Sequence, residues 1–300
     1  MKPIKKIDIH AHAAMYPELR PAWPGAGKRF ISAEEQIAIY DELDIELGVL
    51  LPIVAPEATY DQFSNVECKL LADQYPDRYV WFCNVDPRAQ TYNPTADLSY
   101  LLNHYKALGA KGMGELTAAL PADDPLVDNL FTHCEQCDMP VIIHIAPQKG
   151  DAYGLIDELG LPGIEKMLKK HPNLKLIGHS QPFWAEISSD LTEENRNDYP
   201  TGKVKPGRLV QLMREYGNLY CDLSASSGCN AMSRDPEFAA AFLNEFADRI
   251  FYGCDICIST HTHPYRLNAL LNQLCEERAI SEDVYTKIVR GNAAKLLGIE

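Results

Sequence analysis

Two histidines close to the amino terminus, His10 and His12, are separated by a single residue. A β-strand has a side-chain period of two, so both imidazoles would emerge on one face. They follow the apolar alternation of Ile7 and Ile9, which is typical of a buried first strand that runs out into a loop. Two histidines in this position could chelate one metal ion, although two polar residues at a strand end do not require one.

Three further candidate ligands stand at the ends of short apolar runs. His144 closes residues 139–144, His179 closes residues 174–179, and Asp255 follows residues 249–254. Any one of these could be a core or turn residue, but together they favour a shared metal centre. Imidazole and carboxylate ligands suit zinc best, with manganese, iron or cobalt as alternatives, and one ion is expected rather than two.

An acidic residue, Glu115, ends a fourth run and is expected to point toward the same place. It could bind the metal, bridge two ions, or orient a histidine ligand from behind. Lys111 has the same strand parity but lies deeper, so a modified bridging lysine is the less favoured alternative.

Eight short apolar runs alternate with eight helical patterns. The runs cover residues 6–12, 46–54, 78–85, 110–116, 140–146, 174–180, 219–225 and 250–257. The first helix is expected from a capping-box pattern at Ser32 to Leu47, and the others over 61–75, 95–108, 125–137, 163–170, 206–216, 235–247 and 264–278. This alternation predicts an α/β fold, a (β/α)₈ TIM barrel, with residues 1–300 as a single domain. A doubly wound sheet is the alternative, but the glycine-rich turn expected after its first strand is absent.

Long loops follow the first, fifth and sixth predicted strands, at residues 13–31, 147–162 and 181–205. In a barrel all three lie at the carboxyl-terminal mouth, where active sites are built. The strand-end histidines and carboxylates would converge at the same mouth. The tail from Ser281 is expected to form a closing helical segment.

The composition is that of a globular protein, with 46% hydrophobic and 23% charged residues. The formal net charge of −14 disfavours nucleic acid and anionic membrane surfaces as partners. No apolar run approaches the ~20 residues of a membrane span, and a cytoplasmic location is expected. The nine cysteines show no disulfide-like framework and are expected to be core thiols. A homo-oligomer is compatible with the sequence.

The order of these motifs resembles the amidohydrolase superfamily. The features shared are the first-strand His-x-His, the fourth-strand acid, the histidines ending strands five and six, and the aspartate ending strand eight. The closing segment 290–297 is similar to that of the amidohydrolase-related (amidohydrolase 2) branch. Family members often carry Asp-Trp-Pro after the last strand, whereas this chain has Asp255-Ile256-Cys257, a departure that concerns pocket shape more than metal binding.

The resemblance implies a metal-dependent hydrolase that attacks a small carboxylic, lactone or amide substrate with a metal-activated water. Asp255 would take the proton of that water, and His179 would bind metal or polarise the substrate carbonyl. The alternative is a non-oxidative decarboxylase of a small aromatic or enol acid. A second alternative is a barrel that binds metal without turnover.

Residues in the mouth loops are candidates for contact with the small-molecule substrate. Arg88 could clamp a carboxylate, and Phe183 with Trp184 could form an apolar wall. Arg234, His261 and His263 are further candidates. Each of them has an equally ordinary interpretation as a loop or packing residue. Three other histidines, His104, His133 and His171, fall in predicted helices and are interpreted as structural.

Overall fold

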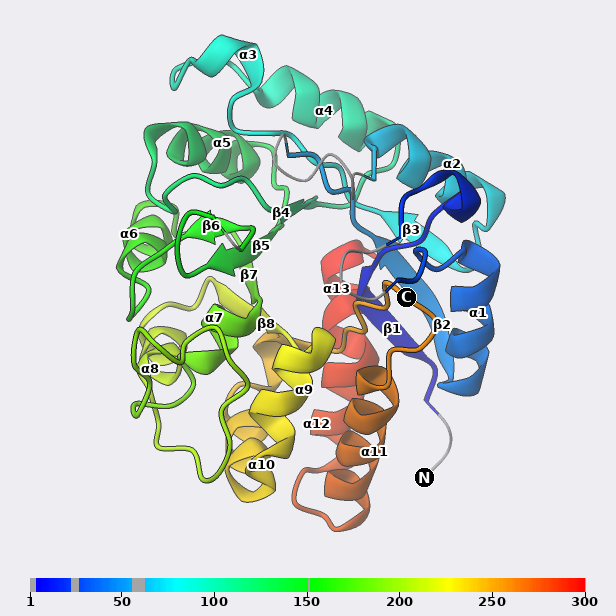
Figure 1. The fold of residues 1–300 in the computed structure, drawn as a ribbon, viewed down its shortest axis with the longest axis vertical. Coiled ribbons are helices and arrows are strands. Elements are labelled where there is room, and N and C mark those ends of the chain that lie inside the picture. The colour runs from blue at the N-terminus through cyan, green and yellow to red at the C-terminus, as the bar shows by residue number, and fades with distance from the viewer. Residues whose placement is uncertain (1–3, 23–26, 56–62, 151, 300) are drawn as a thin grey trace.

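A computed structural model describes residues 4–22, 27–55, 63–150 and 152–299. Eight parallel strands form the centre of the fold (Figure 1). Each falls inside a predicted run, except that the second begins one residue early, at Ile45. Several strands are shorter than their runs, and the last ends at Phe251 rather than at residue 257. They are β1 (Lys6–Ala11), β2 (Ile45–Leu50), β3 (Tyr79–Trp81), β4 (Met113–Leu116), β5 (Val141–Ala146), β7 (Leu176–His179), β8 (Leu219–Asp222) and β9 (Ile250–Phe251). A short additional strand, β6 (Leu155–Ile156), pairs with the end of β5.

The strands close into a barrel through hydrogen bonds at two seams. One sheet has the order β1-β2-β3, and the path through the other is β4-β5-β7-β8-β9. Between β3 and β4, the Cys83 amide donates to the Gly112 carbonyl over 2.9 Å. Between β1 and β9, the Ile9 amide donates to the Tyr252 carbonyl over 3.1 Å. The architecture is therefore the predicted (β/α)₈ barrel.

A ring of helices surrounds the strands (Figure 1). The ring contains α1 (Ala33–Glu42), α2 (Asn65–Gln74), α4 (Ser99–Ala107), α5 (Pro125–Gln136), α6 (Pro162–Lys170), α8 (Arg208–Glu215), α10 (Pro236–Glu245) and α11 (His263–Glu276). The connections also contain the short turn α3 (Ala89–Tyr92) and two helices that sequence reasoning missed, α7 (Gln181–Ala185) and α9 (Ala225–Ser233). The chain closes with α12 (Glu282–Thr286), the π-helical turn η4 (Lys287–Gly291) and α13 (Asn292–Leu297).

The helix boundaries follow local capping chemistry. The predicted capping box at Ser32 is confirmed, because its side chain accepts from the Glu35 amide while the Glu35 carboxylate accepts from the Ser32 amide. The prediction that this helix runs to Leu47 is wrong: α1 ends at Glu42, and Asp44 adopts a positive φ of 57° that breaks the helix before β2. The predicted start of the second helix, Asp61, lies outside the described residues.

The barrel interior below the mouth is filled by apolar side chains. The cluster comprises Ile7, Ile9, Val49, Leu51, Phe82, Ile142, Ile177, Phe251, Ala293, Ala294 and Leu297. Three of these residues belong to α13, so the carboxyl-terminal helix closes the barrel at the end opposite to the mouth. The mouth is thereby left as the end at which polar side chains can gather.

An irregularity in β1 decides which way the first histidine points. Asp8 pairs with Gly48 but Ala11 pairs with Leu50, so β1 holds one more residue than β2 over this stretch. Asp8 lies on the outer face, where it accepts a 2.5 Å hydrogen bond from Tyr40 of α1. Such a bulge shifts the side-chain alternation by one position. Ile9 and His10 therefore both face the barrel interior.

A buried arginine, Arg196, links two loops at the mouth of the barrel. The Arg196 guanidinium donates to the carbonyls of Asp157, over 2.9 Å, and Glu158, over 3.1 Å. Glu186, 3.9 Å from the same guanidinium, accepts a hydrogen bond from the Gly160 amide. These contacts join the loop after β5 to the loop after β7.

All nine cysteines are buried thiols, as expected. Among the described residues there is no helix with the length and apolar character needed to cross a bilayer.

Candidate metal centre

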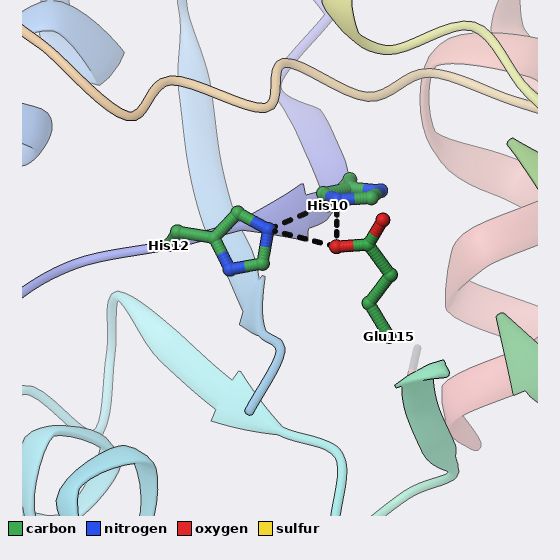
Figure 2. Close-up of side chains that lie close together, drawn as sticks. All are labelled: His10, His12 and Glu115. Carbon is green, nitrogen blue, oxygen red and sulfur yellow. Dashed lines mark hydrogen bonds and ion pairs between the residues drawn. The ribbon is translucent and has the colours of Figure 1, made fainter. Parts of the chain in front are cut away.

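Three side chains meet at the mouth, as Figure 2 shows: His10 from β1, His12 just after it and Glu115 from β4. His10 Nε2 lies 3.1 Å from His12 Nε2. Glu115 Oε2 lies 3.4 Å from His10 Nε2 and 3.3 Å from His12 Nε2. All three residues are buried. The sequence-predicted pair of histidines and the fourth-strand acid are therefore brought together.

The outer nitrogens of both histidines are held by acceptors. His10 Nδ1 lies 2.6 Å from Asp222 Oδ2, and His12 Nδ1 lies 3.0 Å from the Leu51 carbonyl oxygen. A carbonyl can only accept, so His12 carries its proton on Nδ1, and the Asp222 carboxylate favours the same tautomer for His10. Each Nε2 then presents a lone pair to the centre. Lone pairs facing one another beside the Glu115 carboxylate are the arrangement that a cation stabilises.

The spacing of these donor atoms also fits a cation. Ligand atoms about 2.0–2.2 Å from a tetrahedral zinc ion lie roughly 3.3–3.6 Å from one another. Asp255 adds a fourth donor, because its Oδ1 lies 3.6 Å from His12 Nε2 and 3.8 Å from His10 Nε2. Asp255 reaches the site through a backbone φ of 52°, and its amide donates to the His10 carbonyl over 2.8 Å. The residues present therefore fit a divalent metal.

A second group of potential ligands shares Glu115. Its other oxygen, Oε1, lies 2.5 Å from His144 Nδ1, and Glu115, His144 and His179 together could hold an ion. His179 Nδ1 lies 3.0 Å from Ser224 Oγ, and its Nε2 lies 3.8 Å from Asp255 Oδ2. Glu115 thus stands between the two groups, in the position that a bridging ligand would take.

The charges of the centre are strongly coupled. Burial opposes a charge on His10, but Asp222, Glu115 and Asp255 raise its pKa well above the ordinary value, so the Nε2 lone pair becomes available only when a cation displaces the second proton. Burial also opposes ionisation of Glu115 and Asp255, yet the surrounding histidines lower the pKa of both carboxyls. His179 behaves differently, since burial and the nearby His10 lower its pKa to about 4. His179 is therefore neutral at neutral pH while the carboxylates remain ionised.

The aromatic pair predicted to line the mouth lies elsewhere. Phe183 is fully buried and its ring lies over Gly178, where a Cβ would come within 2.1 Å of it. Gly178 alternates with the inward-facing Ile177, so Phe183 packs between the barrel and its helices. Trp184 donates from Nε1 to the Asp222 carbonyl over 2.9 Å, and its ring meets the edge of Phe242 on α10. Both residues lie on α7 and are buried in packing contacts on the outer side of the barrel wall.

The two arginines proposed for the substrate are not in the cluster either. Arg88 is bound bidentately by Asp86 of its own loop, with Nε and Nη2 each 2.7 Å from a carboxylate oxygen. Arg234 caps the end of α9 and lines a pocket that also contains Asp190, Asp198 and Tyr199.

His261 and His263 lie behind Asp255 rather than beside the other ligands. His263 Nε2 donates to the Cys254 carbonyl over 2.6 Å, and His261 Nδ1 accepts from the Cys257 amide over 3.3 Å. Burial lowers the pKa of both imidazoles, with Asp255 close enough to oppose that shift. Their contacts hold the loop after β9. Lys111 is exposed at the opposite end of the barrel, which excludes it as a bridging ligand here.

Sequence reasoning missed three residues of the site. Asp222 ends β8 and forms the hydrogen bond with His10 described above. In the sequence, its position near a strand end is the only indication of this role. Tyr153 lies over His144, with ring centroids 4.3 Å apart. Tyr199 accepts from Gln181 over 2.9 Å, and its pKa is raised by burial and by Asp255. Both tyrosines come from long loops, where sequence periodicity gives no orientation.

A histidine and carboxylate cluster at the carboxyl-terminal mouth of a (β/α)₈ barrel lies where enzymes of this fold build their active sites. A family model for amidohydrolases matches residues 7–299, and the chain belongs to that family. Among curated proteins, none matches this chain.

Several solved structures share the fold over nearly the whole chain. A probable 2-pyrone-4,6-dicarboxylic acid hydrolase from Acinetobacter baumannii is 16% identical, with a TM-score of 0.63 and coverage of 99% of this chain and 100% of that chain. A 5-carboxyvanillate decarboxylase from Sphingomonas paucimobilis is 17% identical, with a TM-score of 0.64 and the same coverage. A 2,6-dihydroxybenzoate decarboxylase from Rhizobium is 17% identical, with a TM-score of 0.63 and coverage of 99% of both chains. At these identities the likeness establishes the fold.

Proposed function

We propose that this protein is a metal-dependent hydrolase of a small carboxylic, lactone or amide substrate. The observation that carries the proposal is the Asp255 carboxylate, which touches both halves of the centre. One of its oxygens lies 3.6 Å from His12 Nε2 and the other 3.8 Å from His179 Nε2. Its side chain is 18% exposed, whereas those of His10, His12 and His179 are at most 2% exposed.

The ligands we assign to one divalent ion, with zinc as the best fit, are His10, His12, Glu115 and Asp255. His144, bound to Glu115, is the next candidate, and His179 the last. Such an ion supplies an acidified water and polarises a substrate carbonyl.

The protein residues then handle the protons. Asp255 is ionised, because the neighbouring imidazoles lower its pKa, so it can accept the proton of the attacking water. It passes that proton to the leaving group. Neutral His179, in the tautomer with its proton on Nε2 and with Ser224 donating to Nδ1, donates a hydrogen bond to the substrate carbonyl oxygen. Ser224 is a positioning residue in this scheme.

The substrate is expected to be small and flat enough to pass the tyrosines at the mouth. Tyr153 covers His144, and Tyr199 stands near Asp255. The named relatives act on carboxylated pyrone or benzene rings, which makes aromatic and lactone carboxylates the first compounds to screen.

The test is an ¹⁸O experiment on purified protein with measured metal content. Small lactones, amides and aromatic carboxylic acids are screened, and any active compound is turned over in ¹⁸O-labelled water. Hydrolysis places the label in the product carboxylate or hydroxyl. Prompt release of carbon dioxide without label in the organic product contradicts the hydrolase and supports a decarboxylase. Metal bound stoichiometrically without turnover across the panel would favour the non-catalytic barrel.

A further inference from the structure

A second pocket lies at the amino-terminal end of the barrel, opposite the metal centre. Its volume is about 530 Å³, within the range of roughly 300–1,000 Å³ typical of small-molecule sites. Residues that precede or begin strands form one side of it, and the closing segment η4 and α13 forms the other. The residues used below are Lys111, Lys175, Tyr220, Phe251, Lys287 and Lys295.

Four lysines gather around this pocket in a chain whose formal net charge is −14. Lys287 is neutralised by Asp248 at 3.0 Å and Asp283 at 3.4 Å. Lys175 has only a distant partner, Asp138 at 3.9 Å. Lys111 and Lys295 form no ion pair with any carboxylate in the described part of the chain. The pocket therefore offers two uncompensated ammonium groups.

The pocket also has an apolar side. The rings of Tyr220 and Phe251 are stacked, with centroids 5.7 Å apart and an interplanar angle of 22°. Phe251 is buried, while Tyr220 is partly exposed and presents its ring to the pocket. A flat apolar group could pack against this pair.

We propose that this pocket binds a small organic dianion with a flat apolar body. Its charged group would lie between Lys111, just before β4, and Lys295, on α13, and its body against Tyr220. Such a ligand would contact both the barrel wall and α13, the helix that closes the barrel with Ala293, Ala294 and Leu297. Binding would therefore also stabilise the folded protein.

The experiment measures binding of phenyl phosphate to the full-length protein by calorimetry at low ionic strength and about pH 8, where the phosphate is a dianion. We expect one saturable site. The double variant Lys111→Gln/Lys295→Gln should weaken binding roughly tenfold or more, since each lost exposed ion pair costs a few-fold. The matched control is Lys169→Gln/Lys205→Gln, which removes two exposed lysines outside the pocket and should leave the dissociation constant unchanged.

Two further arms separate the possible sources of binding. Tyr220→Ala should weaken phenyl phosphate but not inorganic phosphate; equal binding of the two anions overturns the apolar part of the proposal. Phenyl phosphate could also bind the metal centre, so His12→Ala is measured in parallel. Binding lost in His12→Ala but kept in Lys111→Gln/Lys295→Gln overturns the proposal, as does an absence of binding. Neither result bears on the hydrolase assignment, which rests on the ¹⁸O experiment.

Discussion

At the scale of single residues, the tautomers of His10 and His12 determine which of their nitrogen atoms can bind a metal. Asp222 and the Leu51 carbonyl fix the outer nitrogens of His10 and His12, so the inner nitrogens are free to bind a cation. Glu115 and Asp255 supply the negative charge. The centre thus has its ligands oriented before metal arrives, which is the usual role of groups behind a metal site.

Asp255→Asn separates metal binding from proton transfer. The amide keeps the shape and one oxygen ligand but cannot accept a proton, so most of the metal should stay while kcat falls by about 10²–10⁴-fold. Metal content by mass spectrometry and turnover of the identified substrate are the two measurements. The exposed Asp73→Asn serves as a control. A near-normal rate with full metal would remove Asp255 from its proposed role.

Asp222→Asn tests the residue that orients His10. Loss of the carboxylate at 2.6 Å should weaken metal binding by about 10–100-fold, because such partners fix the tautomer of a ligand. Metal affinity is measured by competition with a chromogenic chelator. If the affinity is unchanged while His12→Ala abolishes binding, His10 does not depend on Asp222.

At the scale of elements, strand parity decides which residues reach the mouth. On β7, Ile177 faces the barrel interior and His179 faces the metal centre. Gly178, between them, must be small because the Phe183 ring covers it. The aromatic ring therefore anchors α7 and the start of the long loop against the barrel wall. This contact supports the loop without touching substrate.

Gly178→Ala should destabilise the protein by about 1–3 kcal/mol, because the added methyl would lie 2.1 Å from the Phe183 ring. Urea unfolding measures the change in the free energy of unfolding. Gly217→Ala is the matched control, since nothing lies within 4 Å of its added methyl. Combining Gly178→Ala with Phe183→Leu should recover part of the loss; strictly additive costs would show that the two positions do not clash.

At the scale of the whole molecule, the two ends of the barrel have different tasks. The mouth holds the polar cluster, and α13 closes the other end with apolar side chains packed against Ile7 and Ile9 of β1. Both ends of the chain thus join the same interior. We therefore propose that residues 1–300 are one domain.

Leu297→Ala tests whether the two ends of the barrel have separate tasks. Leu297 is 2% exposed within the interior cluster, so truncation should lower the free energy of unfolding by about 2–4 kcal/mol. Metal affinity, measured where the variant is fully folded, should stay within about twofold because Leu297 packs in the apolar interior and not among the metal ligands. A large loss of metal affinity under those conditions would show that the closing helix and the mouth are coupled.

The sequence by itself determined the order of the strands and which polar residues stand near their ends. Alternating apolar runs predicted eight strands, and the strand-end positions of His10, His12, His144, His179 and Asp255 were sufficient to predict a cluster, because all strands of a parallel barrel end at one mouth. The position of Glu115 at the end of the fourth strand placed it in the same predicted cluster. Local capping chemistry at Ser32 was equally readable, since its partners lie three residues apart.

Only the tertiary structure decided how side chains outside that pattern are directed. A bulge in β1 turns His10 inward together with Ile9, and that bulge appears only in the pairing with β2. Asp222 joins the site through a contact 212 positions away, and Phe183 leaves it because Gly178 faces outward. Lys111 reaches the closing helix at the opposite end of the barrel. Sequence periodicity cannot reveal these arrangements, because each depends on pairing or packing between segments that are distant in the chain.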